Sequence, residues 1–181
     1  SLAGNISSSL NTTAMVRRAT ISGAQAKGKV ATAADVANNE KIVFDSAQDA
    51  GVKMAELARG LETFVSASGD IEGGTKMLRL LTEVAQASGA DIGDIMRAGG
   101  FAYKDIKGPN REEDTQRLMA GFALQGARGN VELKDTSRYV TRFLAPAKQF
   151  EGDYVRNALM IGAIGQLSME GGRSNAYEAT N

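Results

Sequence analysis

The sequence predicts an all-α fold, a compact multihelical domain of about seven helices joined by short, glycine-marked loops. From Thr32 onward, apolar residues recur at the spacing of helices, and no segment shows the alternation of a half-buried strand. Only two prolines, Pro109 and Pro146, punctuate this pattern. A chain of 181 residues is long enough to bury a substantial core.

The first 30 residues are more polar than the rest and positively charged. They are rich in Ser, Thr, Asn and Gly. Asp35 is the first acidic residue of the chain, and four basic residues precede it: Arg17, Arg18, Lys27 and Lys29. We therefore expect residues 1–30 to form a polar, basic N-terminal arm or a marginal helix over about 12–27. Residues 31–181 are predicted to form the helical domain.

The first part of that domain carries one apolar stripe from Val36 to Val65. Gly51 lies inside it, and the sequence leaves open whether this glycine separates two helices or only weakens one. Gly69 closes the segment. The sequence therefore predicts either one long helix or two helices from about Thr32 to Gly69.

Two further helices follow in the predicted order. The first covers about 71–88, with its apolar residues on one face, and ends at Gly89. Asp91 has the character of an N-cap for the second, which runs toward Ile106. We expect the pair Gly99–Gly100 to interrupt that helix.

The stretch "KGPNREED" (107–114) marks the clearest break in the chain. Gly108 and Pro109 end the preceding helix, and Asn110 is the expected cap of the next one. The acidic residues of its first turn favour a helix N-terminus, and this helix is predicted to reach the region 126–129.

The last two predicted helices differ in polarity. The one within 129–145 has an apolar stripe on one face, and Pro146 is expected to end it near Ala145. The stripe consists of Leu133, Val140, Phe143, Leu144 and Ala147. The other, over about 153–169, is apolar almost all round, so we expect it to be buried. Four glycines within or beside these C-terminal helices predict close helix–helix approach: Gly121, Gly126, Gly162 and Gly165.

The composition excludes several kinds of chemistry. The chain has no His and no Cys, so it lacks the commonest general base, the commonest metal ligands and any thiol nucleophile. "GAQAKGKV" (23–30) is close to a P-loop but has Val30 where Ser or Thr is needed, and no predicted strand precedes it. Carboxylate pairs remain available, and Glu83, Glu132, Asp135 and Glu151 are candidates only by residue type. We expect no cofactor, no metal and no small-molecule substrate.

From about residue 55 onward, the order of segments resembles the helical core domain of phage tail tape-measure proteins. The resemblance is strongest over 121–181. It lies in "GFALQGARGNVELKDTSRYVTRFLAPAKQFEGD" (121–153) and in "NALMIGAIGQLSMEGGRSNAYEATN" (157–181). The positions that carry the motif and its packing are Gly129, Val131, Leu133, Lys134, Asp135, Val140, Phe143, Leu144, Gly162, Gly165, Gly171 and Gly172.

This resemblance implies a structural, non-enzymatic role in a phage or prophage tail. Tape-measure proteins act in tail assembly and length determination, so the implied partners are the tail tube and other tail assembly proteins, together with self-association. The implied location is the virion tail, reached through the host bacterial cytoplasm. The balance of 21 basic and 21 acidic residues argues against nucleic acid as a partner. No apolar stretch approaches the length that implies a membrane span.

Two other functions stay open on the sequence. One is a generic helical interaction domain of another large assembly, and the other is a carboxylate-based peptidoglycan-cleaving domain. A helix start near the C-terminal end, with Asn175 as a cap, predicts that this is a fragment of a longer chain.

Overall fold

The computed structural model describes residues 2–128, 140 and 143–170, and side chains of 9–126, 140 and 143–165. It confirms the all-α prediction, because helices and their connections account for the whole described part, without a strand. The helices are α1 (Leu2–Ala26), α2 (Ala33–Ala50), α3 (Met54–Ser68), α4 (Ile71–Ser88), α5 (Ile92–Asp105), α6 (Arg111–Arg128) and α8 (Tyr154–Glu170). Residues 143–147 are also helical.

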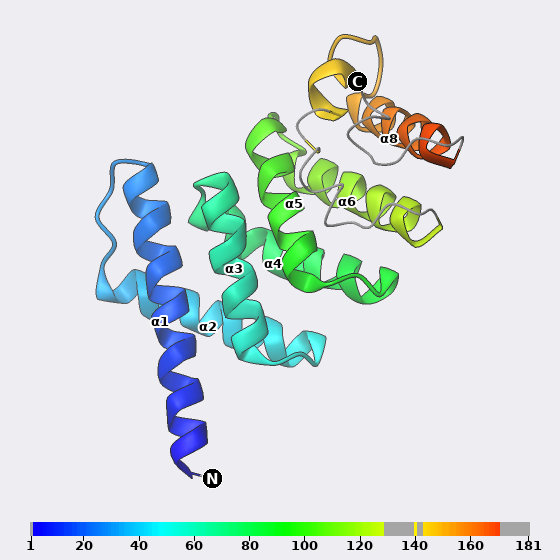
Figure 1. Cartoon of the computed structure of the whole chain (residues 1–181). Coiled ribbons are helices and arrows are strands. Elements are labelled where there is room, and N and C mark those ends of the chain that lie inside the picture. The colour runs from blue at the N-terminus through cyan, green and yellow to red at the C-terminus, as the bar shows by residue number, and fades with distance from the viewer. Residues whose placement is uncertain (1, 129–139, 141–142, 171–181) are drawn as a thin grey trace.

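The first six helices form a stack of two layers. In one layer α3 packs between α1 and α5, and in the other α4 packs between α2 and α6. Successive helices α3, α4, α5 and α6 also contact one another across the layers. Figure 1 shows α1, α3 and α5 side by side in that order, with α8 beyond α6 at the far end of the stack.

Glycine and short polar side chains fix the ends of these helices. Gly51, Gly69 and Gly89 adopt left-handed φ angles of 66°, 70° and 69° directly after α2, α3 and α4. This conformation terminates a helix and favours glycine. Gly51 therefore separates two helices, which settles the question that the sequence left open.

Aspartate side chains cap the N-termini of two central helices, and the cap at Asp91 is the one that the sequence predicts. The Asp91 side chain accepts a hydrogen bond from the Asp94 N–H at 3.0 Å at the start of α5. Asp70 caps α4 in the same way through the Gly73 N–H, at 2.9 Å. Each bond satisfies a backbone donor that the helix itself leaves without an acceptor.

The core is continuous from α1 to the start of α8. Its largest fully buried side chains include Phe64, Met77, Leu81, Ile95, Met96 and Phe122. The rings of Phe64 and Tyr103 lie 5.5 Å apart, and those of Phe122 and Phe143 lie 5.6 Å apart. The first of these tilted ring pairs joins α3 to α5, and the second joins α6 to the helical segment at 143–147.

Of the two alternatives for residues 1–30, an arm or a marginal helix over about 12–27, the structure has a helix, and this helix packs against its neighbours. Within them α1 runs to Ala26, and it contributes Met15, Val16 and Ala19 to the core, each at most 5% exposed. The composition of this segment did not indicate that it is buried, because the face of α1 that packs in the core includes small and hydroxyl-bearing residues such as Ala19 and Thr20. The buried Thr20 hydroxyl, for example, donates to the Val16 carbonyl at 2.8 Å along the helix.

Two other expectations about helix limits are wrong. The helix α5 passes without interruption through Gly99 and Gly100, which are buried against neighbouring helices. The helical segment at 143–147 includes Pro146 and extends two residues beyond the predicted end, since the Lys148 N–H still bonds to the Leu144 carbonyl at 3.2 Å.

Candidate functional site

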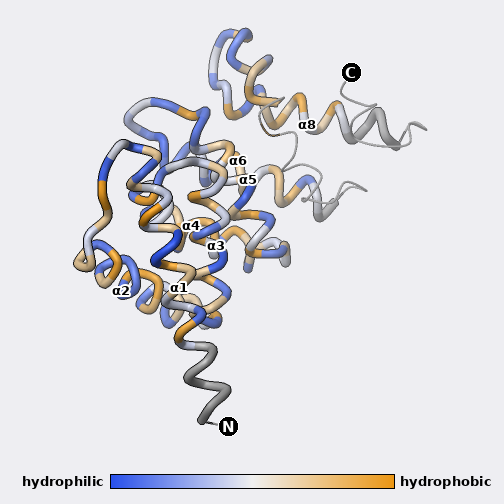
Figure 2. Tube along the Cα trace, turned by 60° about the vertical axis from the view of Figure 1, so that its left-hand side comes forward, coloured by the Kyte–Doolittle hydropathy of each residue, from blue (hydrophilic) through white to orange (hydrophobic). Residues whose placement is uncertain are grey.

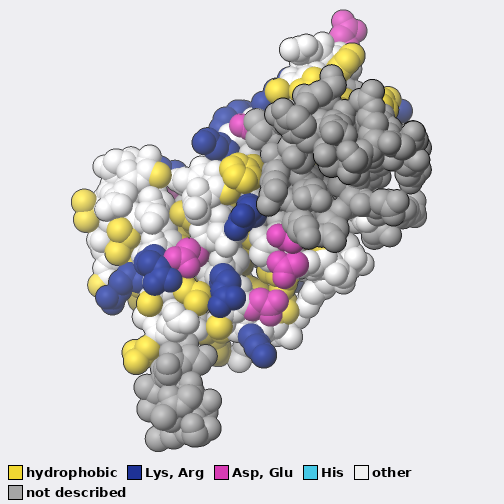
Figure 3. All heavy atoms as spheres, in the orientation of Figure 1, with side chains coloured by type: hydrophobic (Ala, Val, Ile, Leu, Met, Phe, Trp, Pro, Cys, Tyr) yellow, Lys and Arg dark blue, Asp and Glu magenta, His cyan; other side chains and the backbone are white. Residues whose placement is uncertain are grey.

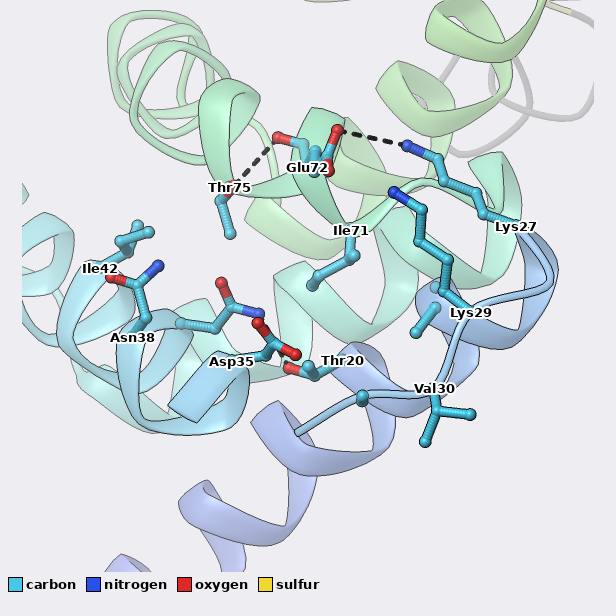
Figure 4. Close-up of a pocket in the computed structure, with 14 residues that line it drawn as sticks. Thr20, Lys27, Lys29, Val30, Asp35, Asn38, Ile42, Ile71, Glu72 and Thr75 are labelled. Carbon is cyan, nitrogen blue, oxygen red and sulfur yellow. Dashed lines mark hydrogen bonds and ion pairs between the residues drawn. The ribbon is translucent and has the colours of Figure 1, made fainter. Parts of the chain in front are cut away.

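A pocket of about 330 Å³ lies where the end of α1, the following loop, α2 and the start of α4 meet (Figure 4). The near-P-loop stretch 23–30 forms one side of it. That stretch continues a helix rather than a strand, and its turn is made by Gly28 with a φ of 68°. The pocket is therefore built from helix ends and not from a strand–loop–helix cradle.

One side of this pocket carries two lysines (Figure 4). The Lys27 ammonium donates to Asp70 Oδ1 at 2.8 Å and lies 3.5 Å from Glu72 Oε2. The hydrogen bond to Asp70 raises the pKa of Lys27, against the opposing effect of burial. The charge of Lys27 is therefore already balanced by Asp70 and Glu72.

Lys29 differs from Lys27 because its ammonium forms no ion pair with a described residue. The nearest acidic candidate on the α2 side, Asp35, is engaged with Thr32. It accepts hydrogen bonds from both the N–H and the hydroxyl of Thr32 at 2.8 Å, and these bonds lower the pKa of Asp35. Lys29 is left as the cation of the pocket that is available to a ligand.

The floor of the pocket contains a buried amide. Asn39 is 9% exposed and donates from Nδ2 to the Thr20 hydroxyl oxygen at 3.0 Å. Its carbonyl oxygen receives no hydrogen bond from the described residues. The apolar walls are supplied by Ile42 and Ile71, on α2 and α4.

Asp70 connects this pocket with the middle of the stack. Besides capping α4 and binding Lys27, it lies 3.7 Å from a guanidinium nitrogen of Arg111. The Arg111 guanidinium stacks 3.6 Å above the Tyr103 ring, and its Nε donates to the Tyr103 carbonyl at 2.7 Å. Burial opposes the ionisation of Asp70, but the Gly73 N–H and the two cations outweigh it and hold the pKa of Asp70 below its ordinary value.

A second surface lies at the other end of the stack. We define the α8 surface as the exposed apolar side chains Phe150, Met160 and Ile164, which are 62%, 54% and 60% exposed. Met160 and Ile164 are four residues apart and so share one face of α8. Figure 2 shows α8 as largely apolar along its described length. The prediction that this helix is buried all round is therefore wrong.

The buried face of α8 packs closely on α6. A Cβ at Gly121 would lie 2.4 Å from Leu159, and one at Gly162 would lie 2.9 Å from the Phe122 ring. This is the close helix approach that the glycines predict. Gln125 adds a hydrogen bond from Nε2 to the Leu159 carbonyl at 2.9 Å.

Polar contacts hold the beginning of α8 against α6. The Tyr154 hydroxyl donates to Asp114 Oδ2 at 3.0 Å. Arg117 bridges the two elements, because it lies 3.1 Å from Asp114 and 2.9 Å from Asp153. Burial and the bond to Asp114 raise the pKa of Tyr154 to about 12.

The residues that carry the family resemblance divide into two groups. Val140, Phe143 and Leu144 are buried in the core, and Gly162 and Gly165 are buried in α8. The others lie outside the described residues: Gly129, Val131, Leu133, Lys134, Asp135, Gly171 and Gly172. The structure thus places the C-terminal half of the predicted stripe and brings it onto Phe122.

The structure describes two of the four candidate carboxylates, and these two lie on different elements. Glu83 pairs with Arg79 at 2.9 Å on the surface of α4, and Glu151 is exposed in the loop before α8. Glu132 and Asp135 lie outside the described residues. In the described part of the chain, no group of three or more acidic residues is arranged to hold a metal ion.

The charge distribution agrees with the neutral composition. On the face shown in Figure 3, basic and acidic side chains are interspersed. None of the described helices combines the length and the hydropathy needed to cross a bilayer. Comparison with models of known protein families, with curated proteins and with solved structures finds no match to this chain.

Proposed function

We propose that this chain is a structural, non-enzymatic module that binds other proteins by helix-on-helix packing, and that it serves in the tail of a phage or prophage. In that setting it acts in tail assembly and length determination as part of a tape-measure protein. The observation that carries the proposal is the α8 surface, where Met160 and Ile164 are exposed on one face of α8.

The stacked architecture explains why such a face suits assembly. In stacks of helices each element buries its apolar side against its neighbour, so a helix face that no neighbour covers is expected to be polar. The outer face of α8 instead presents large apolar side chains. A further helix from a tail protein or from a second copy of the chain would bury them.

The resemblance to tape-measure proteins supports the choice of assembly, because it is strongest over the segment that contains α8. The implied partners are the tail tube protein and other tail assembly proteins. The same surface supports one alternative, a helical interaction domain of another large assembly. The identity of the bound protein separates the two functions.

The test is whether the chain is found in tails. Phage or prophage particles from the organism that encodes the chain would be purified by density gradient, and their tails would be analysed by peptide mass spectrometry. We expect peptides of this chain to sediment with the tube protein. Intact tails without these peptides would contradict the tail function. The alternative, a helical interaction domain of another large assembly, would then be the better explanation.

A further inference from the structure

We propose that the pocket between α1, α2 and α4 binds the C-terminal residue of a peptide chain, with its free carboxylate beside Lys29 and an aliphatic side chain between Ile42 and Ile71. The site lies at the opposite end of the stack from the α8 surface, and the proposal does not depend on the tail function. It assigns a ligand to a pocket that the proposed packing function of the α8 surface does not use.

The charge of the lining selects a ligand with a single negative charge. Lys27 and Lys29 face Asp35 and Glu72, so the four charges balance. Three of them already have partners, because Lys27 contacts Glu72 and Asp35 is held by Thr32. Lys29 alone lacks a counter-charge among the described residues. A dianion such as phosphate would be repelled by the carboxylates of Asp35 and Glu72 and would have only Lys29 as a free cation. A ligand carboxylate has a single charge, which Lys29 alone can balance.

The rest of the pocket complements the remainder of a terminal residue. The carbonyl oxygen of Asn39 receives no protein hydrogen bond in the described residues, although the side chain is almost fully buried. The oxygen itself is accessible to solvent, because in the described residues the only fully buried side-chain oxygen or nitrogen without a partner is Glu40 Oε1. It can therefore accept a hydrogen bond from the last N–H of a peptide. Ile42 and Ile71 supply apolar walls for the side chain.

The size and rigidity of the pocket agree with a small guest. Its volume of about 330 Å³ is at the lower end of the range for ligand sites. The floor is held by close packing of α1 on α4, where a Cβ at Gly23 would lie 2.6 Å from that of Ile71. The N-termini of α2 and α4 are already capped by their own side chains, so the anion is assigned to Lys29 rather than to a helix end.

The first experiment is fluorescence anisotropy of the whole chain with labelled pentapeptides that end in Ala, Val, Leu or Ile, each as the free acid and as the C-terminal amide. We expect the free acids to bind at least about tenfold more tightly than the amides. Equal binding of acid and amide would overturn the proposal, as would failure of all four free acids to bind. 3-Methylbutanoic acid has the carboxylate and the aliphatic group but no amide N–H, so if it binds as tightly as the peptide the proposal is overturned and the site is one for small carboxylic acids.

The second experiment assigns the contact to Lys29. The variant Lys29→Gln removes an exposed charge and leaves the core untouched, and we expect it to weaken peptide binding about tenfold. Lys29→Arg retains the charge and is expected to restore most of the binding. Lys53→Gln is the matched control, because Lys53 is also exposed but does not line the pocket. Equal affinities of Lys29→Gln and Lys53→Gln would contradict the assignment.

Discussion

Gly100 illustrates how single residues set the distances between these helices. A Cβ at this position would lie 2.7 Å from the backbone oxygen of Phe64 and 2.8 Å from the Cβ of Ala67. Neither atom can move without shifting α3, so only glycine allows α3 and α5 to approach this closely. The sequence showed the glycine pair but not its purpose, because a helix break and a helix contact both favour glycine.

We therefore predict that Gly100→Ala lowers the free energy of unfolding by about 1–3 kcal/mol, the usual cost of overpacking a rigid site. Gly60→Ala is the matched control. Its new Cβ would meet the flexible Met96 side chain at 3.1 Å, and alanine is the better helix former. Urea titration measures both variants. Gly100→Ala with the same midpoint as Gly60→Ala would contradict this account.

Asp70 is the residue whose charge connects most elements. Its folded pKa lies below the ordinary value of 3.8, so the unfolded chain binds a proton more readily. The stability that its ionised form contributes is thus present above that value and is lost as the pH falls through the folded pKa. We predict that Asp70→Asn, which retains an N-cap, destabilises the chain at neutral pH.

The difference between wild type and Asp70→Asn should shrink as the solution is acidified, because wild-type Asp70 then loses its charge as well. Urea midpoints measured at several pH values check this convergence. A difference that stays constant down to acid pH would show that the contacts of Lys27 and Arg111 with the carboxylate are not its source.

Among the elements, the limits of α4 and α8 could be predicted, whereas the burial of the terminal helices could not. The limits of α4 were predicted closely because its apolar residues have a strong period and glycine or aspartate flanks both ends. The burial of α1 was missed because its core face includes Ala19 and Thr20, which carry little hydropathy signal. The apolar residues of α8 were recognised, but which of its faces α6 covers depends on tertiary contacts.

The docking of α8 on α6 gives a prediction for a whole element. Tyr154→Phe removes the hydrogen bond to Asp114, and we expect it to cost about 1 kcal/mol and to increase amide hydrogen exchange in α8. Exchange in α3 is the internal control, since α3 does not contact α8. Equal protection of α8 in the variant and the wild type would contradict the role of this bond.

The same bond affects stability at high pH. Folding holds the Tyr154 phenol in its neutral form, with a pKa of about 12 against an ordinary value of 10.0. Its contribution is therefore present below the ordinary value and is lost as the pH rises through the folded pKa. Ultraviolet titration of phenolate formation in wild type and Tyr154→Phe should assign one late-titrating phenol to this residue. An unchanged titration curve would contradict the assignment.

At the scale of the whole molecule, the chain is a two-layered stack with a polar pocket near one end and an apolar face at the other. The sequence predicted the helical class from periodicity, but it could not predict this arrangement. The pocket combines residues near 27 with residues near 71. The α8 surface depends on which face of α8 packs on α6. Both depend on contacts between distant segments.

The most direct test of the proposed packing function places a photo-cross-linking amino acid at Met160 and produces this chain while the tails in which we propose it acts are being assembled. We predict cross-links from position 160 to a helical segment of a tail protein or of a second copy. The same cross-linker at the exposed position of Lys53, outside the α8 surface, should give few or none. Equal cross-linking from both positions, or none from position 160 in assembled particles, would contradict the claim that the α8 surface binds a partner.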